Sequence, residues 1–358
     1  MKELVLHESP SSQKTAVDNC SRVLVSAFRQ YPIRIRSFPQ KNIGDFYLFE
    51  LPCESSSSNA PLIILTHIDT VWSVGKLKEM PFHLEGDRIY GPGVLDMKAG
   101  LTMAFCALQA ICENNLQPKR TIRLIVNSAE EIGNTDAHTF IREQSKQGGM
   151  VLCLEPAIPG GALKVKRKGR LVVKLWTTGR AAHAGSPEKG INAIQELLVQ
   201  LMRVKKLETG GITVTPGLIG GGEKPNVIPE KAWAVLDIRF WGSEDDKNIR
   251  IFLKKLTPHN RKADISFCLE SSTPPMEFTP SSRRLFKKIQ HIASDLGLSL
   301  EPGETGGGSD ASIASSLNIP TIDGLGPDGN GIHAQNEHVI LTSLIERTAL
   351  LFKLLLNL

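Results

Sequence analysis

The first 155 residues alternate between short apolar runs and segments with amphipathic spacing. Continuous apolar runs are typical of strands buried on both faces of a sheet, and three of them predict strands over 62–70, 121–128 and 150–154. Apolar positions at helical spacing predict helices over 13–30, 99–114 and 136–144. Because strands alternate with helices, this pattern predicts an α/β domain with a parallel or mixed sheet flanked by helices.

The pattern changes near residue 168. Strands and helices are then predicted in the order βαββαβ, over 171–178, 187–206, 211–219, 231–241, 244–256 and 263–270. That order is the ferredoxin-like split arrangement. A helix over 281–296, a short strand over 318–323 and a helix over 341–356 resume the first domain. We therefore predict a sheet domain in two parts, 1–167 and 274–358, interrupted by an inserted domain over 168–273.

Composition is that of a soluble globular protein, with 358 residues of which 41% are hydrophobic and 22% charged. The net charge is only +5. The one basic run, 164–170, has no aromatic residues between its charges, so a solvated strand or hinge is favoured over a nucleic-acid site. Residues 54–59 are expected to form a short low-complexity loop.

The cellular setting follows from what the sequence contains. The six cysteines form no CxxC pair and do not require an oxidising compartment. Residues 1–14 are polar and lack the apolar core of a secretory signal, and no run of 18 apolar residues occurs. We therefore expect a cytoplasmic protein with neither a membrane nor a nucleic-acid partner.

Potential metal ligands follow the predicted buried strands. His67 ends the first strand, the pair Glu130 and Glu131 follows the second, and Glu155 follows the third. The carboxyl ends of such strands meet at one edge of an open sheet, so these side chains are expected to share a cleft. Asp96 opens a helix after a Gly-Pro-Gly loop, and taken alone it would be typical of a helix N-cap.

His333 completes a set of two imidazoles and three carboxylates, which suits zinc and also cobalt or manganese. If Asp96 bridges, two metals can each have three protein ligands, the arrangement of two-metal hydrolases. Glu130 is then left over as the natural general base. Asp69 shares a strand face with His67 and can accept its other ring N–H. The alternative is a solvent-facing histidine beside a turn aspartate.

Five motifs in this order resemble a known family. They are His67-Ile68-Asp69, Gly93-Val94-Leu95-Asp96-Met97-Lys98, Glu130-Glu131, Glu155-Pro156 and Gly331-Ile332-His333. Together they are similar to the di-zinc exopeptidases of the glutamate carboxypeptidase, aminoacylase and succinyl-diaminopimelate desuccinylase group, over nearly the whole chain. The resemblance implies two zinc ions, one held by His67, Asp96 and Glu155 and the other by Asp96, Glu131 and His333. It also implies Glu130 as acid and base, Asp69 as the residue that orients His67, and a cis peptide bond after Asp96.

The same resemblance implies that the inserted domain is the lid, which in this family is usually also the dimerisation domain. His183 matches a histidine that reaches the active site, often from the partner subunit, and stabilises the oxyanion there. Asn226 and Arg239 match positions that bind the free carboxylate of the substrate, a task that suits the planar fork of arginine. The alternatives are a surface loop around His183 and an ion pair between Arg239 and Asp237.

Gly307 and Gly308 lie in the glycine-rich run 306–310. Glycine has no Cβ, so backbone there can approach a substrate closely. We therefore expect both glycines to contact the substrate, and the alternative is an ordinary flexible loop.

The resemblance predicts a zinc-dependent hydrolase that cleaves an amide bond next to a free carboxylate, in a small peptide or an N-acyl amino acid. Release of a C-terminal glutamate is the preferred version, although Glu155 suits both carboxypeptidase- and desuccinylase-like members. An N-acyl-amino-acid deacylase or desuccinylase is the alternative. A non-catalytic metal- or peptide-binding relative is disfavoured because Glu130 and every ligand position are filled. A homodimer through the lid is the assembly that the resemblance suggests.

Overall fold

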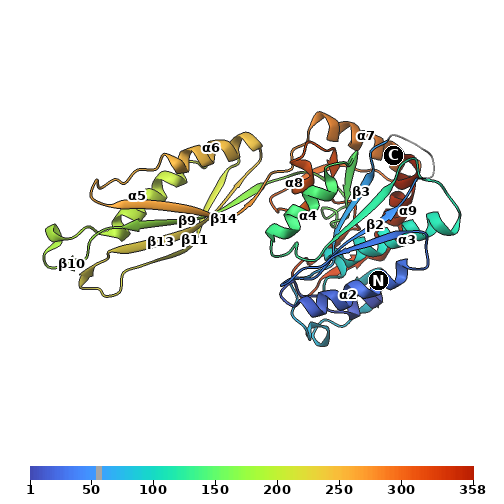
Figure 1. The fold of residues 1–358 in the computed structure, drawn as a ribbon, viewed down its shortest axis with the longest axis horizontal. Helices are drawn as coiled ribbons and strands as arrows, with labels where there is room; N and C mark the ends of the chain where they lie inside the picture. Colours follow the sequence, from blue (N-terminus) through green and yellow to red (C-terminus); the bar gives the residue numbers. More distant parts are fainter. Residues whose placement is uncertain (54–58) are drawn as a thin grey trace. The chain divides into compact units, whose positions relative to one another are not determined.

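The computed structural model of the chain describes residues 1–53 and 59–358, so the predicted loop at 54–59 lies, except for Asn59, outside the described residues. The chain divides into two compact units (Figure 1). The sheet unit comprises Met1–Lys166, Phe278–Thr305 and Ser309–Leu358. The inserted unit comprises Arg167–Glu277 together with Gly306–Gly308.

The sheet unit is built on a mixed six-stranded sheet. Its strand order is β1 (Arg34–Phe38), β2 (Phe46–Leu51), β6 (Ile122–Asn127), β3 (Leu62–His67), β7 (Met150–Cys153) and β16 (Thr321–Ile322). Strand β3 runs parallel to β6 and β7, whereas β2 pairs antiparallel with both β1 and β6. Every residue of β3 is buried, as its continuous apolar run predicts. The carboxyl ends of β3, β6 and β7 therefore meet at one edge of the sheet.

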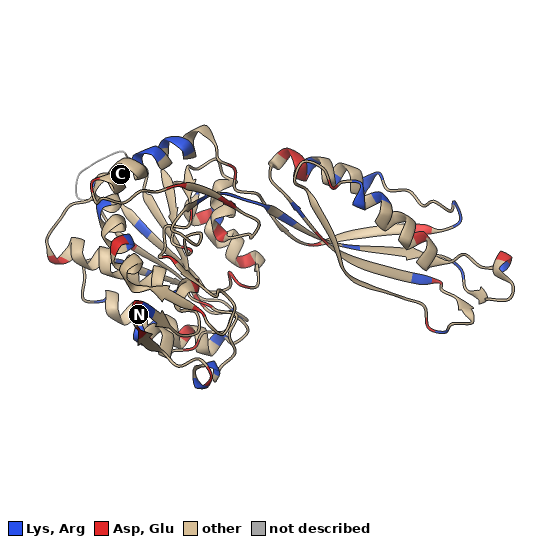
Figure 2. Cartoon of the chain, turned by 180° about the vertical axis from the view of Figure 1, so that it is seen from behind, with Lys and Arg blue, Asp and Glu red and all other residues tan. Residues whose placement is uncertain are grey.

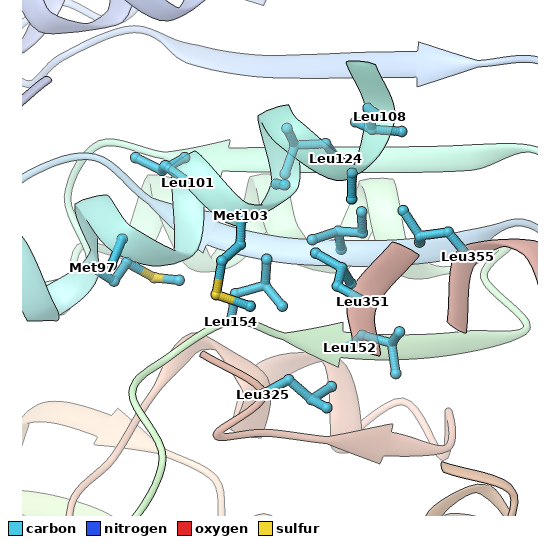
Figure 3. Packing of buried hydrophobic residues seen from close by; sticks show 14 of the residues in the cluster. Met97, Leu101, Met103, Leu108, Leu124, Leu152, Leu154, Leu325, Leu351 and Leu355 are labelled. Atoms are coloured by element: carbon cyan, nitrogen blue, oxygen red, sulfur yellow. The ribbon is translucent and has the colours of Figure 1, made fainter. Parts of the chain in front are cut away.

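Helices flank this sheet, as the alternating pattern predicts. They are α2 (Lys14–Phe28), α3 (Ala99–Glu113), α4 (Thr135–Ser145), α7 (Pro280–Ser294), α8 (Asp310–Ser315) and α9 (Leu341–Asn357). Helices α3 and α9 contact each other, and their leucines interdigitate with Leu124 and Leu152 of the sheet (Figure 3). The exposed side of α7 carries four basic residues, visible in Figure 2: Arg283, Arg284, Lys287 and Lys288.

One helical stretch of the described residues resembles a membrane span in its length and composition. Val94–Glu113 is long and apolar enough to cross a membrane by length and composition alone. Asp96, Lys98 and Gln109 interrupt its apolar residues, so it contains no continuous apolar run of that length. Within the fold, 72% of its apolar window is buried. That burial is typical of a core helix, since its apolar side chains pack against α9 and the sheet.

The inserted unit has the predicted ferredoxin-like order of elements. They are β9 (Gly169–Thr178), α5 (Ala193–Lys205), β11 (Thr213–Gly221), β13 (Lys231–Phe240), α6 (Ser243–Lys254) and β14 (Asp264–Thr273). The strands form an antiparallel sheet in the order β11, β13, β9, β14. Residues of β9 and β13 alternate between buried and partly exposed, as expected for a sheet covered on one face. A short ribbon pairs β10 (Ala182–His183) with β12 (Val227–Ile228).

Several local predictions are wrong for identifiable reasons. The helix expected from residue 187 begins at Ala193, because Pro187–Lys189 form a separate 3-10 turn and Asn192 caps α5 through its side chain. The basic run does not form a solvated strand. Its first part is β8 (Leu163–Arg167), in which Lys164 and Arg167 are 8% and 3% exposed. Short elements that lack a periodic pattern were not predicted: α1 (Lys2–Leu6), α8, β15 (Pro302–Thr305), β17 (Gly329–Asn330) and β18 (His338–Ile340).

Candidate active site

The candidate site lies at the edge where the parallel strands end. His67 is the last residue of β3, Glu130 and Glu131 follow β6, and Glu155 follows β7. In the register of the sheet, His67 lies opposite Asn127 and Leu65 opposite Cys153, so the three strands end together. The chain thereby collects side chains that are separated by up to 88 residues in the sequence.

Two further side chains join this edge from irregular segments. Asp96 lies in a kinked helical turn just before α3, and His333 lies in the loop between β17 and β18. The imidazole Nε2 of His333 is 3.2 Å from both Asp96 Oδ2 and Glu131 Oε2. The imidazole Nε2 of His67 is 3.1 Å from Asp96 Oδ1 and 3.4 Å from Glu155 Oε1. Asp96 thus presents one oxygen to each imidazole.

These side chains fit divalent metals. Ligand atoms of His67, Glu130 and Glu155 lie within 4.8 Å of one another, and so do those of His67, Asp96 and Glu131. Among the described residues, the buried oxygen Oε1 of Glu131 has no hydrogen-bond partner. Imidazole nitrogens and carboxylate oxygens are the donors that zinc, cobalt and manganese accept in proteins.

Protonation compensates the clustered carboxylates. Burial lowers the pKa of His67, but hydrogen bonds to Asp69, Asp96 and Glu155 outweigh burial and raise that pKa well above its usual value. Hydrogen bonds to Asp96 and Glu131 raise the pKa of His333 to about 10. Burial raises the pKa of Glu130 well above its ordinary value. The two imidazoles are therefore cations at neutral pH in the metal-free site, and metal binding must displace their protons.

The buried residue Asp69 makes hydrogen bonds to several of these segments. His67 Nδ1 lies 3.0 Å from the backbone oxygen of Asp69 and 3.4 Å from its Oδ1, so the nearer acceptor is the backbone rather than the carboxylate. The carboxylate accepts the backbone N–H groups of Glu130 and Glu131, each at 3.2 Å. It also accepts the hydroxyl of Ser11 at 2.6 Å. One side chain therefore ties the end of β3 to the two glutamates.

A second buried carboxylate, that of Glu337, holds the loop of Asp96. It accepts the backbone N–H groups of Gly93, Leu95 and Asp96 at 2.9, 2.9 and 3.1 Å, and the indole N–H of Trp72 at 2.8 Å. Gly93 adopts φ +69°, and a Cβ there would collide with Thr70. The peptide bond from Asp96 to Met97 is cis, as the motif implied.

Asp310, in the glycine-rich run, faces the same region. It begins α8, is 5% exposed, and accepts a hydrogen bond from Asn127 Nδ2 at 2.6 Å. Burial raises its pKa to about 7, and the charges of Asp69 and Glu155 act in the same direction. Asn127 ends β6, so this contact links α8 to the strand that leads to Glu130.

In the inserted unit, Arg239 makes the ion pair that was the alternative to a substrate role. Its Nε donates to Asp237 Oδ1 at 2.9 Å, and its Nη1 donates to the carbonyl oxygen of Gly306 at 2.7 Å. The neighbouring carbonyl oxygens of Gly307 and Gly308 accept from Arg167 Nη1 at 3.1 and 2.9 Å. The structure therefore brings the predicted glycines and Arg239 to one place.

His183 and Asn226 lie together elsewhere in that unit. His183 is exposed on β10, and the backbone oxygen of Asn226 accepts from Ala184 N at 2.9 Å. Their ribbon continues from the end of the sheet where Thr178 pairs with Lys231, whereas Arg239 pairs with Arg170 at the other end (Figure 1). At about 3.3 Å per residue these two ends are about 26 Å apart. One chain does not bring Asn226 and Arg239 together.

Sequence comparison decides the family. Residues 63–357 match the family described as peptidase family M20/M25/M40. The chain belongs to this family. Carboxypeptidase G2 of Pseudomonas sp. is 29% identical over 305 residues, which cover 83% of this chain and 74% of that protein. A succinyl-diaminopimelate desuccinylase of Verminephrobacter eiseniae is 25% identical, over 81% of this chain and 76% of that enzyme.

Solved structures agree on the M20 fold. The aminopeptidase PepT of Bacillus cereus aligns with a TM-score of 0.78 at 21% identity, covering 99% of this chain and 95% of that chain. An M20 metallo-carboxypeptidase of Sulfolobus solfataricus aligns with a TM-score of 0.72 at 16% identity, covering 100% and 98%. The chain is therefore a metal-dependent hydrolase of the M20 family.

Three residues of this M20 site were missed in the sequence: Ser11, Asp310 and Glu337. Asp310 was inside a motif noted only for its glycines, and Glu337 follows His333 closely but sits in an irregular loop. Neither residue has a periodic or spacing signal. Ser11 lies ahead of the family match and also offers none.

Proposed function

We propose that this M20 hydrolase is a di-zinc exopeptidase that cleaves an amide bond next to a free carboxylate and preferentially releases a C-terminal glutamate. The observation that carries the proposal is the position of Glu130. Its carboxylate lies within 4.8 Å of ligand atoms of His67 and Glu155, while five other side chains are available as ligands. Similarity to carboxypeptidase G2 supports the carboxypeptidase version.

In this proposal His67, Asp96 and Glu155 hold one metal, and Asp96, Glu131 and His333 hold the other. Bound divalent metals supply Lewis acidity and lower the pKa of water. Glu130 removes the proton of the attacking water and later delivers a proton to the leaving amine. The raised pKa of Glu130 supports this role, because burial makes its carboxylate a stronger base than an exposed one.

Arg239 anchors the free carboxylate of the substrate. Asp237 and Gly306 already orient its guanidinium, and a planar fork oriented in this way can donate paired hydrogen bonds to a second carboxylate. The glycine loop beside it carries Gly307 and Gly308, whose carbonyl oxygens are fixed by Arg167.

His183 and Asn226 serve the active site of a second copy. Their ribbon continues from the end of the four-stranded sheet that lies about 26 Å from the end carrying Arg239, a span that a small substrate does not bridge. Exposed apolar side chains support a dimer through this unit. Leu198 and Met202 on α5 are 51% and 68% exposed, and Leu218 on the edge strand β11 is 60% exposed. Helix α5 packs against β11, so these exposed residues lie on two elements in contact.

Complementation between two inactive variants tests this arrangement. Arg239→Ala and His183→Ala chains are coexpressed with different tags, and the mixed dimer is purified. If His183 acts from the partner, one of the two active sites of the mixed dimer contains both Arg239 and His183. Because the wild-type dimer is symmetric, the mixed dimer should then recover about half of the wild-type activity. Absence of recovery in a verified mixed dimer would place His183 in the site of its own chain.

A desuccinylase or N-acyl-amino-acid deacylase is the second candidate, supported by the similarity to succinyl-diaminopimelate desuccinylase. It requires the same hydrolytic residues with a different pocket for the acyl group. All six cysteines are free thiols, which supports the cytoplasmic setting that either enzyme would share.

A substrate screen separates the candidates. Zinc- or cobalt-loaded protein is assayed against dipeptides and N-acyl amino acids that end in acidic, basic or apolar residues. Release of glutamate from acidic substrates supports the carboxypeptidase, and activity only on succinylated or short-chain acylated amines supports the deacylase. Glu130→Gln should bind metal normally and lose at least about 100-fold in kcat, whereas Glu143→Gln, an exposed glutamate on α4, should not. Near-normal turnover by Glu130→Gln would refute the assigned base.

A further inference from the structure

Residues ahead of the family match are bonded to the end of β3. The backbone N–H of Thr70 donates to Ser9 O at 2.8 Å, and that of Ser11 donates to Thr70 O at 3.2 Å. The hydroxyl of Ser9 donates to Ile68 O at 2.7 Å. Residues 9–11 therefore lie as a short parallel extension alongside the residues that follow His67.

Ser11 reaches into the site itself. Its hydroxyl donates to Asp69 Oδ2 at 2.6 Å, and Ser11 and Asp69 are 4% and 0% exposed. The same Oδ2 accepts Glu131 N, while Oδ1 accepts Glu130 N. A carboxylate with its donors on fixed sides has one favoured rotation. The Ser11 hydroxyl is the only donor to this carboxylate, among the described residues, that comes from outside the strand-end loops.

We propose that Ser11 is a positioning residue of the active site. By fixing the rotation of the Asp69 carboxylate, it sets the position of the backbone that carries Glu130 and Glu131, and it keeps Oδ1 3.4 Å from Nδ1 of His67. The N-terminal segment 4–11 is thereby a functional part of the site and not only packing. This inference rests on the proposed hydrolytic function for its kinetic consequences, but its effect on metal affinity does not depend on the substrate.

Two anchors hold the segment in place. Lys98, 1% exposed, donates from Nζ to the carbonyl oxygens of Leu4 and His7 at 2.8 and 3.0 Å. The carboxylate of Glu8 accepts Gly75 N at 2.7 Å and Leu77 N at 2.9 Å. The segment is thus attached to Lys98, two positions after Asp96, and to the loop after β3. Because of these attachments, Ser11 cannot move with the Asp69 carboxylate if that carboxylate rotates.

The test compares Ser11→Ala with Ser12→Ala, because Ser12 is the adjacent and exposed serine. Zinc affinity is measured by chelator competition, kcat and KM on the best substrate of the screen, and urea unfolding on the metal-free proteins. Loss of a hydrogen bond to a residue that supports a metal ligand typically lowers metal affinity or activity about 10- to 100-fold. We expect that loss for Ser11→Ala in zinc affinity and kcat, with KM changed less than about threefold. Ser12→Ala should match the wild type.

Two further variants separate positioning from packing. Ser11→Thr keeps the hydroxyl and should recover most of the lost affinity. In an Asp69→Asn background, removal of the Ser11 hydroxyl should have less than a third of its effect in the wild type, since the two groups act as one unit. The proposal is overturned if Ser11→Ala matches Ser12→Ala in zinc affinity and kcat, or if the effects of Ser11→Ala and Asp69→Asn are additive. If the wild type cleaves nothing in the screen while Ser11→Ala still binds zinc weakly, the proposed substrate class fails and the positioning role stands.

Discussion

Replacement of Glu337 by glutamine should damage the metal site without touching a ligand. The carboxylate is 1% exposed, and each of its oxygens accepts two hydrogen bonds. Burial raises its pKa, but the four donors favour its charged form. A glutamine keeps only one oxygen, so two of the four donors then face an amide NH₂ group. Because a bond to a charged acceptor contributes about 1.5–3 kcal/mol, the loss amounts to about 3–6 kcal/mol.

That loss is large against a typical folding free energy of about 5–15 kcal/mol. Urea unfolding of the metal-free proteins measures it directly, and chelator competition measures the effect on zinc. We expect a lower unfolding midpoint and at least about tenfold weaker zinc binding, because Asp96 N is one of the four donors. Trp72→Phe removes a single donor outside the Asp96 loop and should cost about 1.5–3 kcal/mol with little change in zinc affinity.

Glu346→Gln, on the exposed side of α9, is the matched control and should resemble the wild type. The reasoning is wrong if Glu337→Gln unfolds at the wild-type urea concentration and binds zinc with wild-type affinity. It is also wrong if Trp72→Phe weakens zinc binding as much as Glu337→Gln, since the indole N–H donates to Glu337 and not to the backbone of that loop.

Three further predictions concern other parts of the site. Arg239→Ala should raise KM at least about tenfold with a smaller change in kcat, since a lost charged hydrogen bond is about 1.5–3 kcal/mol; an unchanged KM would remove Arg239 from carboxylate recognition. Zinc binding at pH 7 should release more than one proton, because His333, with a pKa of about 10, and His67 are charged in the metal-free site. Calorimetry in buffers of different ionisation enthalpy measures the number of protons released. Release of no proton would contradict the assignment of these two histidines as metal ligands. Burial raises the pKa of Asp310 from 3.8 to about 7, so its contribution to stability is complete below pH 3.8 and is lost as pH rises through 7, by at most about 4 kcal/mol. Asp310→Asn should therefore flatten the fall in the unfolding free energy of the metal-free protein between pH 4 and 8, and an unchanged slope would exclude this source.

The sequence predicted the ligand-bearing strands because burial on both faces leaves a continuous apolar run. β3, β6 and β7 each carry such a run, and the first polar side chain able to bind a metal comes at or just beyond its end. Parallel pairing then places those ends together, which is a consequence of sheet geometry. The strands of the inserted unit could be predicted in a similar way, because the alternation between buried and partly exposed positions in β9 and β13 follows the alternation of apolar and polar residues in their sequences.

The supporting residues could not be predicted in this way. The bond from Glu337 to Asp96 spans 241 positions, and the bond from Ser11 to Asp69 spans 58. Both partners lie in loops or at element ends, where no period of 2 or 3.6 marks which way a side chain points. The separation of His183 from Arg239 could not be predicted from the sequence either, because it depends on which ends of β9 and β13 pair with each other.

Two buried carboxylates outside the proposed ligand set, those of Asp69 and Glu337, support different parts of the site. Asp69 ties His67 to Glu130 and Glu131, whereas Glu337 ties the loop of Asp96 to the segment that follows His333. Asp96 contacts the imidazoles of both halves, so it is where the two supports meet. A metal site assembled from strand ends alone would leave Asp96 and His333 on unsupported loops. The edge of the sheet therefore positions three of the five proposed ligands, and hydrogen bonds to the buried Glu337 hold the loop that carries Asp96.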